Sequence, residues 1–320
     1  MNSSLHVVLG AGPAGTTLAR ALVTRGHRVR VVDRSAVEAP AGAELRRADL
    51  TDPEQALRAT EGASVLYHCV NVSYHLQVEV MPRIARSVVR AASHHGARLV
   101  VLDTLYPYGE ADGEAITEST PWAATSRKGR MRADLDSFYL RRHEAGDAWV
   151  ALGRSADFFG PGVVNSTLGG AFFPGALTDE PVLALGDTSL PHSYSFVPDV
   201  AAGLATLGEA REEDGGRVWH LPAVPAVTTD EVHREVGRLV GRPLRVHRLE
   251  EARPYGPFDE TFMAEYAEMF YQHLLPQNMV STAFEQRFEA HPTPLLEALE
   301  STLDWYSTQL SQAAGERAPS

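Results

Sequence analysis

Residues 5–33 read LHVVLGAGPAGTTLARALVTRGHRVRVVD. A short apolar run enters the glycine-rich turn Gly10-Ala11-Gly12-Pro13-Ala14-Gly15, an amphipathic stretch follows, and a second apolar run ends at Asp33. A strand, a glycine turn, a helix and a second strand with a terminal acid form the pattern of a dinucleotide-binding βαβ unit. The alternative interpretation of the same residues is a glycine turn that holds no ligand.

The three glycines of the turn are expected to have different tasks. Gly10 permits the tight turn, Gly12 lets the backbone approach a pyrophosphate, and Gly15 lets the helix pack on the strand. The N-terminus of the helix favours the negative charge of the phosphates. Pro13 and Ala14 belong to the same predicted cofactor loop.

Composition limits the classes of function that remain. The 320 residues contain one cysteine, Cys69, so no intramolecular disulfide and no cysteine-based metal site is expected. The net charge of −12 argues against nucleic acid and anionic membranes as partners. No apolar run approaches the ~20 residues of a membrane span, and the first residues do not resemble a secretory signal, so we expect a cytoplasmic protein without a metal. The one basic cluster, residues 127–132, is expected on a solvated helix face.

Strands and helices are predicted to alternate beyond the first unit. Such alternation implies a Rossmann-type, doubly wound parallel sheet in an α/β fold, with its ligand site beyond the carboxyl ends of the strands. The expected strands are residues 44–48, 64–68, 97–103 and 148–152, and the expected helices are residues 53–60, 78–95 and 128–145.

From about residue 155 the sequence changes to Gly- and Pro-rich stretches with more widely separated helices, expected at 229–240, 259–275 and 294–309. We therefore expect a nucleotide-binding domain over 1–160, rejoined by about 190–222 through a strand at 217–221. Residues 161–189 and 223–320 are expected to form a smaller, mainly helical part that binds the substrate or covers it.

Several segments in order resemble the short-chain dehydrogenase/reductase superfamily, in its extended and atypical branch of NAD-dependent epimerase/dehydratase-like proteins. They are Ala48–Asp52, Leu66–Asn71, Val101–Gly109, Gly153–Gly162 and Phe196–Ala201. The resemblance implies that the first segment lies against adenine, that the second lies along the cofactor, and that Thr104 occupies the position of the catalytic Ser/Thr. The cofactor-binding residues implied are Asp49, Leu50, Cys69, Val70 and Asn71.

The chain departs from this family at the catalytic pair. Members with the usual mechanism carry Tyr-x-x-x-Lys, in which Tyr transfers the proton while Lys lowers its pKa and holds the nicotinamide ribose. No tyrosine lies between Tyr108 and Tyr139. Lys128 is a candidate for contact with the ribose or the substrate, and Arg130 fits the lysine position about as well in a helix register shifted by two.

Another group must then supply the proton in a ketone reduction. The candidates are Thr104, Tyr74 in the loop after the cofactor-lining strand, His192, and a hydroxyl on the substrate itself. Each side chain also has a structural interpretation: Thr104 as a loop residue bonded to local backbone, Tyr74 as a packed aromatic, and His192 as a core histidine.

The choice between NAD and NADP depends on Asp33, Arg34 and Ser35. An acid at this strand end accepts hydrogen bonds from the ribose 2′-hydroxyl and favours NAD(H). An arginine one residue later pairs with a 2′-phosphate, and Arg30 or Arg47 would add to that field. The expectation is NADP(H) or NAD(H), with a slight preference for NADP(H).

The predicted activity is NAD(P)H-dependent reduction of a ketone on a bulky or aromatic small molecule, by a monomer or homodimer. The pattern is similar to atypical ketoreductases of bacterial secondary metabolism, the simocyclinone C-7 ketoreductase type among them. An aromatic stripe over residues 258–271 is interpreted as a lid over an apolar pocket, or as core or a dimer face. Alternatives are a non-catalytic NAD(P)-binding sensor, a nucleotide-sugar epimerase/dehydratase-like isomerase, and a flavoprotein.

Overall fold

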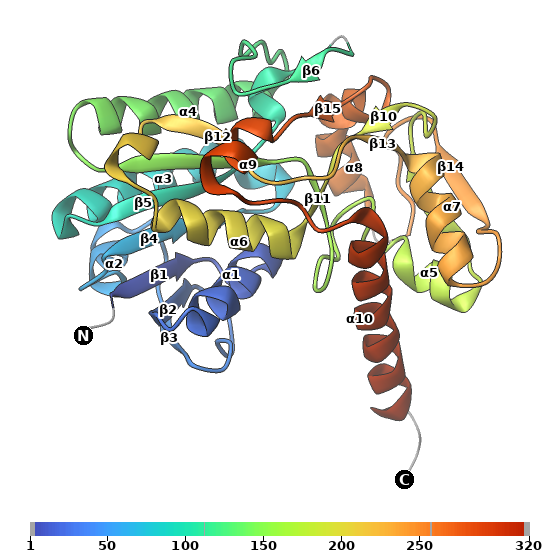
Figure 1. Ribbon diagram of the computed structural model, residues 1–320, viewed down its shortest axis with the longest axis horizontal. Helices are drawn as coiled ribbons and strands as arrows, with labels where there is room; N and C mark the ends of the chain where they lie inside the picture. The colour runs from blue at the N-terminus through green and yellow to red at the C-terminus, as the bar shows by residue number, and fades with distance from the viewer. Residues whose placement is uncertain (1–3, 112, 257, 317–320) are drawn as a thin grey trace.

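A seven-stranded parallel sheet forms the centre of the molecule, in a computed structural model that describes residues 4–111, 113–256 and 258–316 (Figure 1). Its strand order is β12-β7-β5-β4-β1-β2-β3, which confirms the predicted doubly wound α/β fold. The strands are β1 (Leu5–Leu9), β2 (Arg28–Asp33), β3 (Ala43–Arg47), β4 (Val65–His68), β5 (Arg98–Thr104), β7 (Val150–Ser155) and β12 (Arg217–His220).

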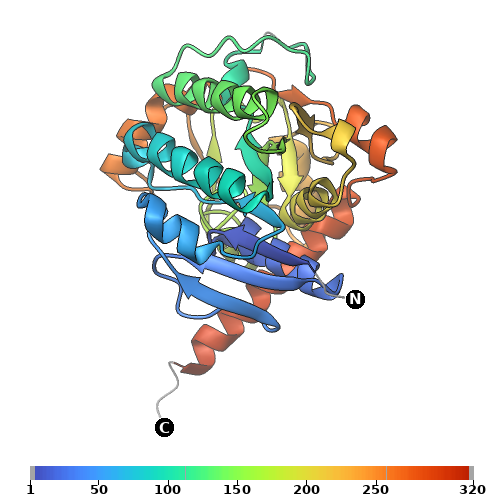
Figure 2. The ribbon, with the colours of Figure 1, turned by 90° about the vertical axis from the view of Figure 1, so that its left-hand side faces the viewer.

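Helices cover both faces of the sheet because its strands are apolar on both sides. Side chains alternate along β1, so that Val7 and Leu9 pack toward one group of helices and Val8 toward the other. The first group is α2 (Pro53–Ala59), α3 (Gln77–His95) and α4 (Arg127–Glu144), and the second is α1 (Pro13–Thr24) and α6 (Val197–Gly208) (Figure 2).

A second part with short strand pairs and helices lies beyond the carboxyl ends of the sheet (Figure 1). Its pairs are β8 (Asp157–Phe159) with β11 (Tyr194–Phe196), β9 (Val182–Leu185) with β14 (Val246–Leu249), β10 (Pro191–His192) with β13 (Val227–Thr228), and β6 (Ala115–Ile116) with β15 (Asn278–Met279). Its helices are α5 (Phe173–Thr178), α7 (Thr229–Leu239), α8 (Glu260–Tyr266) and α10 (Leu295–Glu316), whereas α9 (Thr282–Phe288) packs against β12 of the sheet. Short 3-10 turns are η1 (Tyr74–Leu76), η2 (Tyr106–Tyr108), η3 (Glu212–Asp214) and η4 (Ala267–His273).

The helix expected at 294–309 is α10, which continues to Glu316. Two further predicted elements also differ from the observed ones. The strand expected at 148–152 is β7, which continues to Ser155 through the charged residue Arg154. Arg154 is fully buried, and its guanidinium donates to Asp103 on β5 (2.7 Å) and to Asp136 on α4. These ion pairs allow the charged Arg154 to lie inside a buried strand. The sequence-based prediction ended the strand before Arg154 because it followed the apolar residues only. The single helix expected at 259–275 divides into α8 and η4.

Candidate active site

The glycine loop lies at the carboxyl end of β1. Gly10 has a φ of +100°, and a Cβ atom there would lie 3.1 Å from the Cys69 carbonyl oxygen and the Val70 backbone. A Cβ on Gly15 would overlap the carbonyl oxygen of Gly10. Gly12 differs, because no atom lies within 4 Å of the position its Cβ would take. Gly12 therefore borders open space at the start of α1.

Asp33 closes this loop from the end of β2. Its carboxylate accepts hydrogen bonds from the amides of Ala11 (3.0 Å), Ser35 (2.8 Å) and Ala36 (2.8 Å). Burial acts to raise the pKa of Asp33, but these hydrogen bonds hold it below its ordinary value. Arg30 does not add to a positive field here, because its guanidinium is buried and bonded to Glu44 and to the carbonyls of Ala59 and Glu61.

Arg34 is exposed beside Asp33, and the Arg47 guanidinium donates to the carbonyl of Ala36 (3.3 Å). The predicted adenine-side segment lies next to the same strand end, since the amide of Ala48 donates to the carbonyl of Asp33. Within that segment, Asp49 accepts from the amide and hydroxyl of Thr51, which lower its pKa.

The other predicted cofactor residues fall into two groups. Leu50 is a core residue, 6% exposed. Cys69, Val70 and Asn71 follow β4 and border the glycine loop at Gly10, while burial raises the pKa of the Cys69 thiol to about 12. The structure thus brings the glycine loop, Asp33 and the loop after β4 together at one edge of the sheet.

A cavity of about 170 Å³ lies where the carboxyl ends of β4, β5 and β7 meet the second part of the molecule. The sheet contributes Asn71, Tyr74 and Thr104 to its wall. The predicted aromatic stripe supplies an opposing wall of Phe258, Phe262, Met263 and Tyr266, whereas Met269 and Phe270 pack in the core. Two of the predicted proton donors, Thr104 and Tyr74, are therefore in one cavity.

Buried polar atoms without hydrogen-bond partners face this cavity. Among the described residues that line it, Ser155 Oγ, Thr167 Oγ1 and Gln277 Oε1 have no partner. Buried polar groups in folded proteins are normally satisfied, and an unsatisfied group points to a water or a ligand. Three such atoms on residues that line one cavity indicate a ligand that carries polar groups.

Tyr74 and Tyr106 form a phenol pair in the cavity wall, with their hydroxyls hydrogen-bonded to each other. Burial raises the pKa of Tyr74 well above its ordinary value, and burial together with the charge of Asp157 raises the pKa of Tyr106 to about 12. Both phenols consequently keep their protons at neutral pH. Tyr106 was not among the sequence-based candidates, although it stands two residues after Thr104.

His192 reaches the cavity only through a neighbour. It is 5% exposed, and its Nε2 lies 2.9 Å from Oδ2 of Asp157, which lines the cavity. The ring of His273 stacks on that of His192, and its Nε2 lies 2.6 Å from the Tyr266 hydroxyl oxygen. In the part of the chain that the structure describes, Asp157, His192 and His273 are also a group with ligand-type atoms within 4.8 Å of one another.

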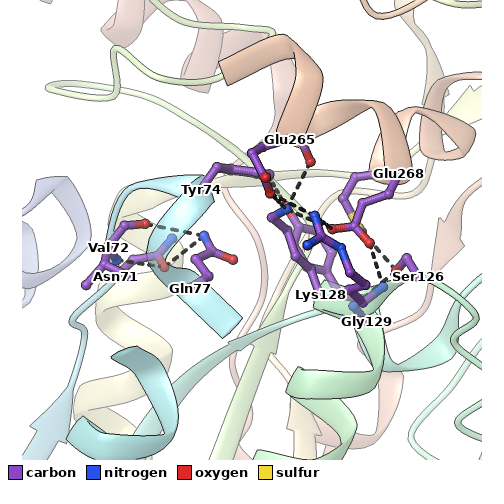
Figure 3. Close-up of polar contacts among 12 residues, drawn as sticks. Asn71, Val72, Tyr74, Gln77, Ser126, Lys128, Gly129, Glu265 and Glu268 are labelled. Carbon is purple, nitrogen blue, oxygen red and sulfur yellow. Dashed lines mark hydrogen bonds and ion pairs between the residues drawn. The ribbon is translucent and has the colours of Figure 1, made fainter. Parts of the chain in front are cut away.

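Lys128 is fully buried and is turned away from the sheet toward the second part (Figure 3). Its ammonium donates to the Glu265 carbonyl (3.0 Å), the Glu265 carboxylate (2.6 Å) and the Glu268 carboxylate (2.8 Å). An ammonium has three protons, and these contacts use all of them. Lys128 also lies 5.4 Å from the centre of the Tyr74 ring. The expectation of a solvated face at 127–132 was wrong for this residue, since ion pairing permits its burial.

Arg132, four residues later, is the residue that the sequence reasoning missed. It is 5% exposed, its Nη2 donates to Oδ1 of Asn71 (3.3 Å), and its Nε has no partner among the described residues. Lys128 and Arg132 are four residues apart, the same step as in Tyr-x-x-x-Lys. That spacing was the available signal. Arg130, the alternative considered from sequence, is exposed.

The sequence model described as the NAD dependent epimerase/dehydratase family matches residues 6–221, from β1 to just beyond β12. The chain belongs to this family. The match includes the glycine loop, Thr104 and α4, and the NAD dependence named for the family agrees with the predicted nicotinamide cofactor. The flavoprotein alternative does not agree with this membership.

Solved structures of family enzymes share the fold over nearly the whole chain. MoeE5 in complex with UDP-glucose and NAD is 21% identical, with a TM-score of 0.79, covering 96% of this chain and 100% of that chain. The Thermus thermophilus UDP-glucose 4-epimerase complex with NAD is 21% identical, with a TM-score of 0.76, covering 95% and 99%. A double mutant of the Streptomyces venezuelae dTDP-glucose 4,6-dehydratase DesIV, with NAD bound, is 19% identical, with a TM-score of 0.78, covering 96% and 98%.

No curated protein matches the sequence. Within the described residues, no helix combines the length and apolar character needed to cross a membrane.

Proposed function

We propose that this protein is an NAD(P)H-dependent reductase of an aromatic ketone, working without the usual catalytic tyrosine. One observation carries the proposal: the cavity beyond the strand ends combines Thr104, the protonated Tyr74–Tyr106 pair and a wall of aromatic rings. A benzene molecule fits an apolar cavity of about 150 Å³. At about 170 Å³ the cavity has room for one ring and a carbonyl, and a larger substrate needs the aromatic wall to move.

The residues around the glycine loop support the proposal, because they can hold a dinucleotide. The free start of α1, with no side-chain cap, offers amides and positive dipole charge to a pyrophosphate, and Gly12 leaves space for it. In this proposal Asp33 accepts from the adenosine ribose, and Arg132, which is hydrogen-bonded to Asn71, donates to the nicotinamide ribose. When bound there, NAD(P)H supplies the hydride for carbonyl reduction. With Arg30 committed elsewhere and Asp33 ionised, we propose a preference for NAD(H) rather than the NADP(H) expected from sequence.

The protein groups stabilise and protonate the oxygen that gains charge. In this proposal the Thr104 hydroxyl donates a hydrogen bond to the ketone oxygen, and Tyr106 donates its phenolic proton as that oxygen becomes an alkoxide. A phenol with a pKa of about 12 is a stronger acid than an alcohol, so this transfer is downhill. Tyr74 then supports the phenolate through their shared hydrogen bond.

Charge in the cavity argues against a nucleotide-sugar substrate. None of the described residues that line it is a lysine or an arginine, whereas Asp157 contributes a carboxylate. A diphosphate is bound by positive groups and repelled by a carboxylate. The structure therefore favours a ketone without phosphates over the substrates bound in the similar structures.

Stopped-flow and steady-state oxidation of NADH and NADPH against a panel of aromatic ketones tests this function. We expect binding of NADH, turnover with a subset of ketones, and a loss of roughly 100-fold or more in kcat for the Tyr74→Phe/Tyr106→Phe double variant, at unchanged cofactor Kd. Tyr271→Phe, a tyrosine outside the cavity wall, is the matched control. Binding of NADH without turnover of any ketone would favour the sensor interpretation.

A further inference from the structure

We propose that the Asp157 carboxylate is a binding subsite for a hydrogen-bond donor on the substrate, a hydroxyl or an ammonium close to the ketone. The inference rests on the proposed function, because it names the substrate class of the same cavity. It assigns to Asp157 a role in selecting the substrate and not in moving its proton.

Asp157 is held in place while one of its oxygens stays available. It begins β8, whose backbone pairs with β11 in parallel register, and Asp157 stands opposite Tyr194. His192 Nε2 bonds to Oδ2 at 2.9 Å, whereas Oδ1 has no hydrogen-bond partner among the described residues. The side chain is 23% exposed, and that exposure opens into the cavity. The structure thus holds the Asp157 carboxylate in a fixed orientation, with Oδ1 available to accept a hydrogen bond.

The charge of this acceptor has little compensation in the wall around it. Burial acts to raise the pKa of Asp157, but hydrogen bonding and charge from His192 hold it below its ordinary value, so the group is ionised at neutral pH. Burial and His192 lower the pKa of nearby His273 to about 4, which leaves that ring neutral. A partly buried carboxylate requires hydrogen-bond donors, and a substrate donor would meet that need at Oδ1. The aromatic rings of Phe262 and Tyr266 in the same wall would also favour a cation.

The position of Asp157 relative to Thr104 limits where the donor sits. Thr104 stands opposite Ser155 in the sheet, and Asp157 follows Ser155 by two residues. Extended backbone places the Cα atoms of Ser155 and Asp157 about 7 Å apart. A ketone oxygen on Thr104 and a donor on Asp157 are then bridged by a substrate whose donor is on the carbon next to the carbonyl or one carbon further.

Calorimetric binding of three ketones in saturating NAD⁺, where no reduction occurs, tests the subsite apart from turnover. The probes carry their substituent on the carbon next to the carbonyl. They are 2-hydroxy-1-phenylethanone, 2-amino-1-phenylethanone as its ammonium salt, and 2-methoxy-1-phenylethanone, which lacks a donor. We expect the first two to bind about tenfold or more tightly than the methoxy compound, and the better of the two identifies the donor as hydroxyl or ammonium. Asp157→Asn should reduce the preference for the ammonium compound to below about threefold.

Asp187→Asn, which removes an exposed carboxylate outside the cavity, should leave these preferences unchanged. Equal binding of the three ketones, or no binding of any, would overturn the subsite, and this comparison in the unaltered protein stands even if Asp157→Asn does not fold. A divalent metal present in the purified protein and lost in Asp157→Asn would also overturn it, because the carboxylate would then serve a metal with His192 and His273. Donor selectivity without NADH turnover would separate this subsite from the reductase proposal.

Discussion

Lys128 and Arg132 are four residues apart on α4, and they have different partners in the structure. Lys128 joins α4 to Glu265 and Glu268, which belong to α8 and η4. Arg132 lies at the cofactor side, behind Asn71. We propose that Arg132 serves the nicotinamide ribose, whereas Lys128 holds α4 to α8 and η4 through its ion pairs.

For Lys128→Met we expect a loss of roughly 1–3 kcal/mol in the free energy of unfolding, because two carboxylates lose their buried partner. The KM for the ketone should rise, while the Kd for NADH stays nearly constant. Urea unfolding and fluorescence titration measure the two effects. Arg127→Ala is the control, since Arg127 pairs with the same carboxylates but its side chain is 61% exposed. A large rise in the Kd for NADH, with stability intact, would contradict the assignment.

Unlike Lys128→Met, the Arg132→Met variant is expected to change the affinity for NADH. Loss of a hydrogen bond to the ribose should weaken NADH binding about tenfold or more, because bonds from charged groups contribute about 1.5–3 kcal/mol. Arg132→Lys should recover part of this affinity. Equal NADH affinity in the Met variant and the unaltered protein would remove Arg132 from the cofactor site.

At the scale of single residues, the sequence predicted the positions of some site residues and missed the roles of others. The glycine loop, Asp33 and Thr104 stand at strand ends because local patterns determine them. Lys128, Arg132 and Tyr106 contact residues more than 30 positions away, such as Glu265, Asn71 and Tyr74. The four-residue spacing of Lys128 and Arg132 could point to the pair but not to what the two residues contact.

At the scale of elements, the turn from β1 into α1 allows a matched comparison of two glycines. Gly15→Ala should destabilise the fold and disturb cofactor binding together, because the new Cβ overlaps the Gly10 carbonyl. Gly12→Ala should change the free energy of unfolding by less than about 1 kcal/mol and still prevent tight binding of NADH, because its Cβ enters only open space. Thermal unfolding and NADH titration distinguish the two. Normal NADH affinity in Gly12→Ala would refute the assignment of the pyrophosphate site.

The alternation of strands and helices was predictable because each strand carries a continuous apolar run. The short strand pairs of the second part were not predicted, since two to four residues are too few to show a period. The break between α8 and η4 was missed for a similar reason, because Ala267 and Glu268 are compatible with a continuous helix and tertiary contacts end α8 there.

At the scale of the whole molecule, buried neutral histidines make stability depend on pH. Burial lowers the pKa of His6, His220, His233 and His273 to about 4 and that of His68 to about 3. The unfolded chain binds protons at these rings near pH 6.5, so their contribution to stability is complete above about pH 6.5 and is lost as the pH falls toward 4. Asp136 and Asp199, whose pKa values burial raises, act in the opposite direction.

We therefore expect the Tm to fall between pH 7 and pH 5, and the fall to be smaller in a His68→Asn variant, which lacks one of these rings. Calorimetry at several pH values measures both slopes. A Tm that stays constant over this range would show that the histidine rings gain protons in the folded protein as well.

The Lys128 ion pairs join α4 to α8 and η4, two elements that also carry part of the cavity wall (Figure 3). We expect these ion pairs to limit how fast the aromatic wall moves when a substrate enters and a product leaves. Turnover would then fall in a viscous solvent, yet it would depend little on salt, because salt screens buried ion pairs only weakly.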